Sequence, residues 1–126
     1  MENKRILYGD DNEQKKESLA RELRLRRLEV DLASTPAETI SKARAGNYFA
    51  VVTDLNYTEE GTEGYEVLKQ LKDLPAKKIL YTGQAGFEYV ADGFMHGADY
   101  VVLSKHEKSL LEVLDKLLKG GEKDGK

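Results

Sequence analysis

The sequence of 126 residues contains no cysteine, which excludes disulfide bonds and metal sites built from thiolates. It has no hydrophobic run near the roughly 20 residues that a membrane-spanning helix needs, and its N-terminus does not have the form of a signal peptide. Positive charge is not in excess, since the net charge is −3. This balance argues against nucleic acid as the main partner, because phosphate binding favours a positively charged surface. We therefore expect a soluble cytoplasmic protein with no direct contact to nucleic acid or to a membrane.

Short apolar runs alternate along the chain with longer amphipathic segments. The apolar runs lie at 6–8, 30–33, 50–53, 79–81 and 100–103. Three of them are continuously apolar and rich in β-branched residues, which is typical of parallel strands covered on both faces. The run at 30–33 instead alternates polar and apolar residues, as a half-covered edge strand would.

Between these runs, apolar residues recur with the spacing of amphipathic helices. The predicted helices lie near 13–27, 35–46, 67–74, 87–97 and 110–118. This order predicts an α/β fold of the flavodoxin-like (βα)5 type, a three-layer sandwich around a parallel five-stranded sheet in order 2-1-3-4-5. We expect one domain over 1–119 and a flexible C-terminal tail over 120–126, with no room for an effector domain.

Acidic residues follow two strands that are neighbours in this sheet. Asp10 and Asp11 come after the first strand, and Asp54 comes after the third. In open α/β sheets, ligands bind outside the carboxyl ends of the strands. Three carboxylates at one point repel each other and require a cation, and Mg²⁺ prefers such oxygen ligands. Taken singly, each of these aspartates is better explained as a helix or turn cap, so the metal site depends on the three occurring together.

Thr82 and Lys105 end the fourth and fifth strands. Taken singly, such residues are usually a strand hydroxyl and a solvated surface lysine. Beside an acidic pocket, a hydroxyl and an ammonium suit phosphoryl transfer, which depends on positioning and on charge neutralisation. An aspartate can itself be the nucleophile and form an acyl phosphate.

From Lys4 to Leu118 the chain resembles the receiver domain of bacterial two-component response regulators. The resemblance is carried by four short stretches, Ile6 to Asn12, Val51 to Asp54, Tyr81 to Gly83, and Lys105. It implies that Asp54 accepts a phosphoryl group, that Thr82 hydrogen-bonds one phosphoryl oxygen and that Lys105 neutralises another. It also implies a Mg²⁺ site made by Asp11 directly, by Asp10 partly through water, by Asp54, and by the backbone carbonyl of Asn56.

The resemblance further implies the partners and the output. The phosphodonor would be a sensor histidine kinase or a phosphotransfer protein, and phosphorylation would switch a surface that binds a downstream effector protein. Receivers often pair through the fourth and fifth helices, so a homodimer is a further expectation. The domain would not be an enzyme beyond promoting its own phosphorylation and dephosphorylation.

The sequence departs from the family pattern in two loops and one strand. The stretch after Asp54 lacks the usual proline and runs about two residues long, and His106 stands where proline usually follows the lysine. Val102 occupies the position of a switching aromatic residue, while Tyr100 lies two positions earlier. These departures motivate an alternative, a pseudo-receiver that binds proteins without being phosphorylated.

Two enzyme or cofactor classes with similar patterns are less well matched. Phosphatases with an aspartyl-phosphate intermediate commonly have a second aspartate two residues after the nucleophile, where this chain has Asn56. A flavin-binding protein needs a phosphate loop after the first strand, where Asp10 and Asp11 would repel phosphate.

Overall fold

In the computed structural model of the protein, which describes residues 3–59, 61–84, 86–103 and 107–123, strands and helices alternate along the chain. The strands are β1 (Arg5–Gly9), β2 (Glu29–Ala33), β3 (Ala50–Thr53), β4 (Lys77–Thr82) and β5 (Tyr100–Leu103). The helices are α1 (Glu13–Leu25), α2 (Pro36–Ala45), α3 (Glu63–Gln70), α4 (Phe87–Met95) and α5 (Glu107–Lys123).

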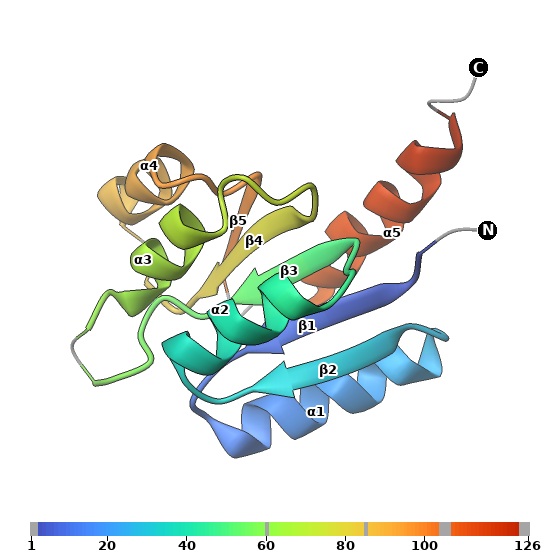
Figure 1. Ribbon diagram of the computed structural model, residues 1–126, viewed down its shortest axis with the longest axis horizontal. Coiled ribbons are helices and arrows are strands. Elements are labelled where there is room, and N and C mark those ends of the chain that lie inside the picture. The colour runs from blue at the N-terminus through green and yellow to red at the C-terminus, as the bar shows by residue number, and fades with distance from the viewer. Residues whose placement is uncertain (1–2, 60, 85, 104–106, 124–126) are drawn as a thin grey trace.

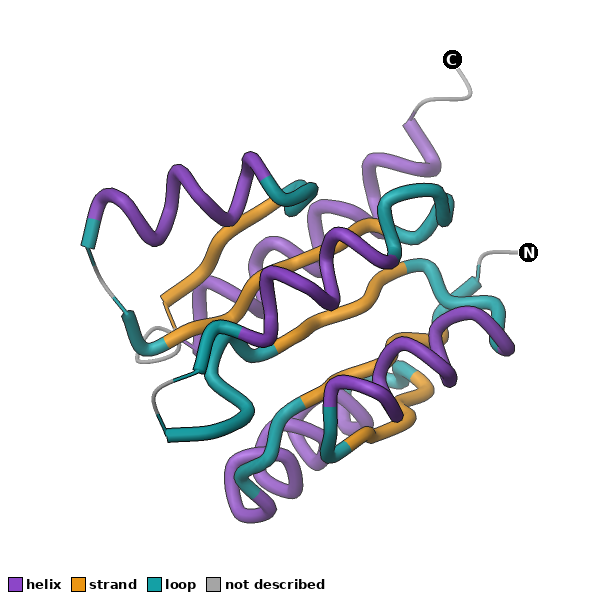
Figure 2. Tube along the Cα trace, turned by 60° about the vertical axis from the view of Figure 1, so that its left-hand side comes forward, coloured by secondary structure: helices purple, strands orange, loops and turns teal. Residues whose placement is uncertain are grey.

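The five strands form one parallel sheet in the order β2-β1-β3-β4-β5. Helices α1 and α5 cover one face, and α2, α3 and α4 cover the other (Figure 1). Figure 2 shows the same three layers from a second direction. The flavodoxin-like (βα)5 prediction is therefore confirmed, including the strand order and the edge position of the alternating strand β2.

The central strand β1 supplies side chains to both layers. Ile6 and Tyr8 enter the core beneath α1 and α5, whereas Leu7 enters the core beneath α2 and α3. All three are fully buried. Each such side chain contributes about 1.5–3 kcal/mol through burial, so these three residues stabilise β1 at the centre of the sheet.

Two helix starts follow from capping residues. The side chain of Asn12 accepts a hydrogen bond from the Lys15 N–H at 2.9 Å and begins α1. The Thr35 hydroxyl accepts one from the Glu38 N–H at 3.0 Å, while the Glu38 carboxylate accepts one from the Ser34 N–H at 2.8 Å. These two reciprocal hydrogen bonds explain why α2 begins at the start of the predicted helix near 35–46.

Two helix ends differ from the sequence pattern. Helix α3 ends at Gln70, whereas the predicted helix extends to about residue 74. Helix α5 continues through Gly120 and Gly121 to Lys123, whereas the predicted helix ends near residue 118 and a tail is expected from residue 120. Backbone hydrogen bonds require no side chain, and about 1 kcal/mol per glycine does not stop a helix that is already propagating. The described part of segment 120–126 is therefore helical.

Among the helices of the described residues, none combines the length and the apolar character needed to cross a membrane.

Candidate functional site

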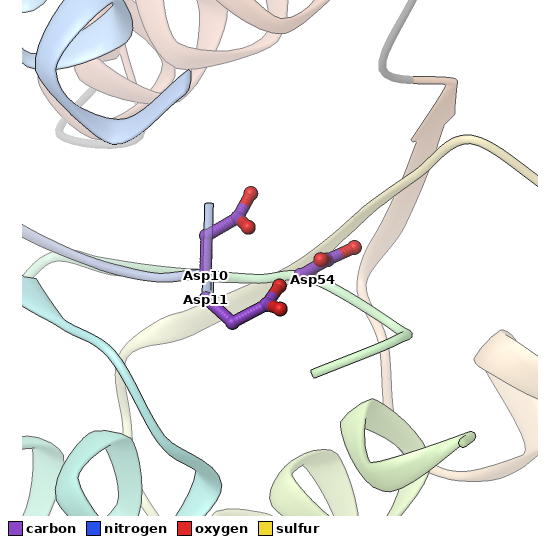
Figure 3. Close-up of side chains that lie close together, drawn as sticks. All are labelled: Asp10, Asp11 and Asp54. Atoms are coloured by element: carbon purple, nitrogen blue, oxygen red, sulfur yellow. The ribbon is translucent and has the colours of Figure 1, made fainter. Parts of the chain in front are cut away.

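Three aspartates meet where β1 and β3 end. The two strands pair in parallel with Gly9 opposite Thr53, so the residue that follows each strand emerges at the same edge. The Asp54 N–H continues the ladder by donating to the Gly9 carbonyl at 2.9 Å. One carboxylate oxygen each from Asp10, Asp11 and Asp54 lie within 4.8 Å of one another. Figure 3 shows the three side chains gathered at this point. The structure thus brings together the acidic residues that the strand-end rule selected.

The three carboxylates differ in exposure. Asp10 is 1% exposed and Asp54 is 7% exposed, whereas Asp11 faces solvent. Burial and the neighbouring charge of Asp10 raise the pKa of Asp54 to about 7, against the opposing effects of Lys15 and of a hydrogen bond from the Asn56 backbone. A buried acid next to a second acid holds its proton because the charged pair is poorly solvated. Among the described residues, the positive charge beside Asp54 is therefore too little to keep its pKa at the ordinary value.

Asp10 is held by three neighbours, two of which sequence reasoning missed. Its Oδ2 accepts a hydrogen bond from the Tyr8 hydroxyl at 2.6 Å and lies 3.4 Å from Lys15 Nζ. Its Oδ1 accepts a hydrogen bond from the Asn12 N–H at 2.9 Å. Burial and the charge of Asp10 raise the pKa of Tyr8 far above its ordinary value, so the hydroxyl remains a donor. Strand alternation could have indicated the contact with Tyr8. Side chains two residues apart point to the same face of a strand, and Tyr8 lies two residues before Asp10.

Thr82 lies at the end of β4, which pairs with β3. The residue is fully buried, and its hydroxyl oxygen accepts a hydrogen bond from the Gln84 N–H at 3.0 Å. Lys105, predicted as the cationic partner of the phosphoryl group, and its neighbour His106 lie outside the described residues.

The long loop after Asp54 is closed by its own side chains. The Glu63 carboxylate accepts hydrogen bonds from the Tyr57 N–H at 3.1 Å and from both the backbone and the hydroxyl of Thr58. The Asn56 side chain donates to the Gly61 carbonyl. Hydrogen bonds thus fix the backbone where the family usually has proline. The side-chain amide of Asn56 thus points into the loop. Its backbone carbonyl remains as the group that would bind the predicted metal ion.

Tyr57 turns inward beneath the acidic cluster. Its hydroxyl lies 3.0 Å from the Thr39 hydroxyl and 2.8 Å from the Thr53 hydroxyl, and the residue is 5% exposed. A Cβ built on Gly9 would stand 2.3 Å from both the Thr39 hydroxyl oxygen and the Tyr57 hydroxyl. Glycine at this position therefore makes room for the tyrosine.

The strand positions associated with the family's aromatic switch have ordinary core roles here. Val102 is 6% exposed and belongs to the core beneath α1 and α5, against which the half-buried Tyr100 also packs. Tyr100 is thus a partly buried residue of β5. His96, at the C-terminal end of α4, stacks on the Tyr65 ring at 4.6 Å between centroids and so has a packing role.

The chain matches no protein-family model, and no curated protein sequence matches it either. Solved structures do match over nearly its whole length. A CheY-like receiver domain protein from Methanospirillum hungatei is 29% identical with a TM-score of 0.85, covering 98% of this chain and 99% of that one. The response regulator TrrA from Thermotoga maritima, solved with Mg²⁺ and BeF, is 31% identical with a TM-score of 0.78, covering 91% and 99%.

A third neighbour shows chemistry at an aspartate in its own chain. A response regulator from Burkholderia pseudomallei, solved with a phosphorylated aspartic acid, a calcium ion and citrate, is 26% identical with a TM-score of 0.80. The match covers 96% of this chain and 72% of that one. Given the shared strand order, the acidic strand ends and the 31% identity to TrrA over nearly both full lengths, this chain belongs to the family of CheY-like receiver domains of response regulators.

Proposed function

We propose that Asp54 accepts a phosphoryl group from a sensor histidine kinase or a phosphotransfer protein, and that this event changes the affinity of a downstream protein. The observation that supports the proposal most is the convergence of Asp10, Asp11 and Asp54 within 4.8 Å at neighbouring strand ends. Solved relatives with a phosphorylated aspartate or with Mg²⁺ and BeF share this fold.

The donor set suits Mg²⁺, which takes carboxylate and carbonyl oxygens and retains several waters. Asp10, Asp11, Asp54 and the backbone carbonyl of Asn56 are the groups that would hold the ion. When bound, Mg²⁺ neutralises negative charge on the transferring phosphoryl group.

In the transfer step a carboxylate oxygen of Asp54 attacks the phosphorus of a phosphohistidine. The new O–P bond forms as the P–N bond breaks, and the electron pair of the P–N bond returns to the imidazole nitrogen. The ring is already protonated at its other nitrogen and therefore leaves as neutral imidazole. The ionised form of Asp54 is the nucleophile. Because its pKa is raised, nearby positive charge is needed to favour that form. Thr82 would donate a hydrogen bond to one phosphoryl oxygen, and Lys105 would neutralise another.

The same residues argue against turnover of small phosphate esters. Asn56 stands where aspartyl-phosphate phosphatases carry an acid/base aspartate, and an amide cannot transfer the required proton. We propose that the only reactions promoted are phosphorylation and dephosphorylation of Asp54 itself, in the cytoplasm, where a histidine kinase would meet its receiver.

Helix α4 is the surface that we assign to the effector. Phe87 is 86% exposed and Met95 is 76% exposed on this helix, and exposed apolar groups favour protein binding. The Asp54 phosphoryl group would act on α4 through Thr82 and the loop that follows β4. It would shift the populations of two conformations of this loop and helix.

Incubation with acetyl phosphate and Mg²⁺, followed by intact mass spectrometry, tests the proposal. The wild type should gain the mass of one phosphoryl group, and hydroxylamine should remove it, as expected of an acyl phosphate. The control variant Asp54→Asn should gain none. An unlabelled wild type would instead favour the pseudo-receiver, which the altered sequences after Asp54 and Lys105 suggest.

A further inference from the structure

Lys15 lies against the acidic cluster from the first turn of α1. Its ammonium is 3.4 Å from Asp10 Oδ2, the oxygen that also accepts the Tyr8 hydrogen bond. The Asp10 side chain is 1% exposed, while that of Lys15 is 29% exposed. The ammonium is therefore partly withdrawn from water beside a carboxylate that is almost completely withdrawn, and their attraction is weakly screened.

Aromatic rings fix the lysine in this place. Its Nζ lies 5.1 Å from the centre of the Tyr81 ring, within the range of cation–π attraction. The Tyr8 ring meets the Tyr81 ring edge-on, with 6.1 Å between their centres. Asn12 caps the Lys15 N–H and so sets the point at which α1 begins. Side chains of a helix lean toward its N-terminus, which directs Lys15 back over the cluster.

We propose that Lys15 is a built-in counter-cation of the acidic cluster, and that it opposes a divalent metal ion bound there. In the absence of metal, its charge offsets part of the repulsion among Asp10, Asp11 and Asp54. With metal present, the ammonium and the ion repel each other across the carboxylate that both attract. Lys15 thus weakens the metal affinity and stabilises the metal-free fold. The opposition to the metal rests on the proposed function, whereas the counter-cation role does not.

The direct test compares the wild type with Lys15→Met, which keeps length and apolar contact with Tyr81 but removes the charge. Mg²⁺ affinity is measured by calorimetry, and unfolding is followed by heating in EDTA. Lys15→Met should bind Mg²⁺ at least about tenfold more tightly, because removing one positive charge near a divalent ion has roughly that effect even at the dielectric constant of water. In EDTA it should melt lower by about 5 °C.

Two matched controls separate charge from packing. Lys15→Arg, which restores the charge, should return both values toward the wild type. Lys116→Met, on the exposed face of α5, should change neither. In an Asp10→Asn background, Lys15→Met should lose most of its effect on melting, because its partner is already neutral.

Unchanged or weaker Mg²⁺ binding by Lys15→Met would overturn the opposition to metal. Equal melting of Lys15→Met and wild type in EDTA would overturn the counter-cation role. If no variant binds Mg²⁺, the proposed function loses its metal, and the melting comparison still decides for or against Lys15 as counter-cation.

Discussion

The hydroxyl of Tyr57 occupies the space beside Gly9 that a side chain there would need. It bridges the hydroxyls of Thr39 in α2 and Thr53 in β3, directly behind the strand ends that carry the acidic cluster. A residue of the loop after Asp54 is thereby tied to the middle of the fold. The loop differs from the family pattern in sequence, yet it is anchored at both ends, by Tyr57 and by Glu63.

Gly9→Ala should destabilise the protein by about 1–3 kcal/mol, because the new methyl group overlaps the Tyr57 and Thr39 hydroxyls. Urea unfolding measures the loss. Tyr57→Leu should also destabilise, through the lost hydrogen bonds and the smaller volume. The double variant should lose clearly less than the sum of the two, since leucine vacates the space that alanine needs. Strict additivity would show that the two positions do not compete.

The stability of the metal-free protein should fall as pH rises through neutrality. Burial and Asp10 raise the pKa of Asp54 to about 7, above its ordinary value of 3.8, so the folded state holds a proton that the unfolded chain has released. The stabilisation is complete below about pH 4 and is lost as pH rises through about 7. Urea unfolding in EDTA should show a decline on the order of a few kcal/mol.

Asp54→Asn is the control for this pH dependence, because it retains both histidines and every other acid. Its stability should be nearly flat between about pH 5 and 8. The carboxylates whose pKa is lowered, such as Asp31 and Glu38, titrate below this window and do not interfere. Parallel curves for the two proteins would contradict the raised pKa.

The link between α3 and α4 gives a third prediction. Tyr65 donates its hydroxyl to the Tyr89 carbonyl at 3.2 Å and stacks on His96, so one side chain touches both ends of α4. Among the described residues of α4, Gly93 is the buried one. Tyr65→Ala should therefore speed amide exchange in α4 while leaving exchange in β1 and β3 close to the wild type. Uniform acceleration across the sheet would mean global destabilisation instead.

The sequence predicted the sheet and the acidic cluster for the same reason. Apolar runs separated by amphipathic segments specify a parallel sheet, and its topology then places residues 10 and 54 at one edge. The meeting of these carboxylates, those of Asp10, Asp11 and Asp54, can therefore be predicted from the order of the elements along the chain alone.

The support around the cluster did not follow from order along the chain. Lys15 contacts Asp10 only because the Asn12 cap places Lys15 in the first turn of α1, from which its side chain leans back toward the N-terminus of the helix. The fit of Tyr57 to Gly9 and Thr39 joins three separate elements, and no local pattern encodes such a contact. The helical continuation through Gly120 reflects propagation from residues before it, which a single-residue breaker rule omits.

The most direct test of phosphoryl acceptance at Asp54 is the position of the acyl phosphate in the chain. After incubation with acetyl phosphate and Mg²⁺, borohydride reduction converts an aspartyl phosphate to homoserine, which peptide mass spectrometry locates. We predict homoserine at residue 54 alone, and none when Mg²⁺ is replaced by EDTA. Homoserine at Asp10 or Asp11, or at no aspartate, would contradict the assignment of Asp54 as the phosphoacceptor.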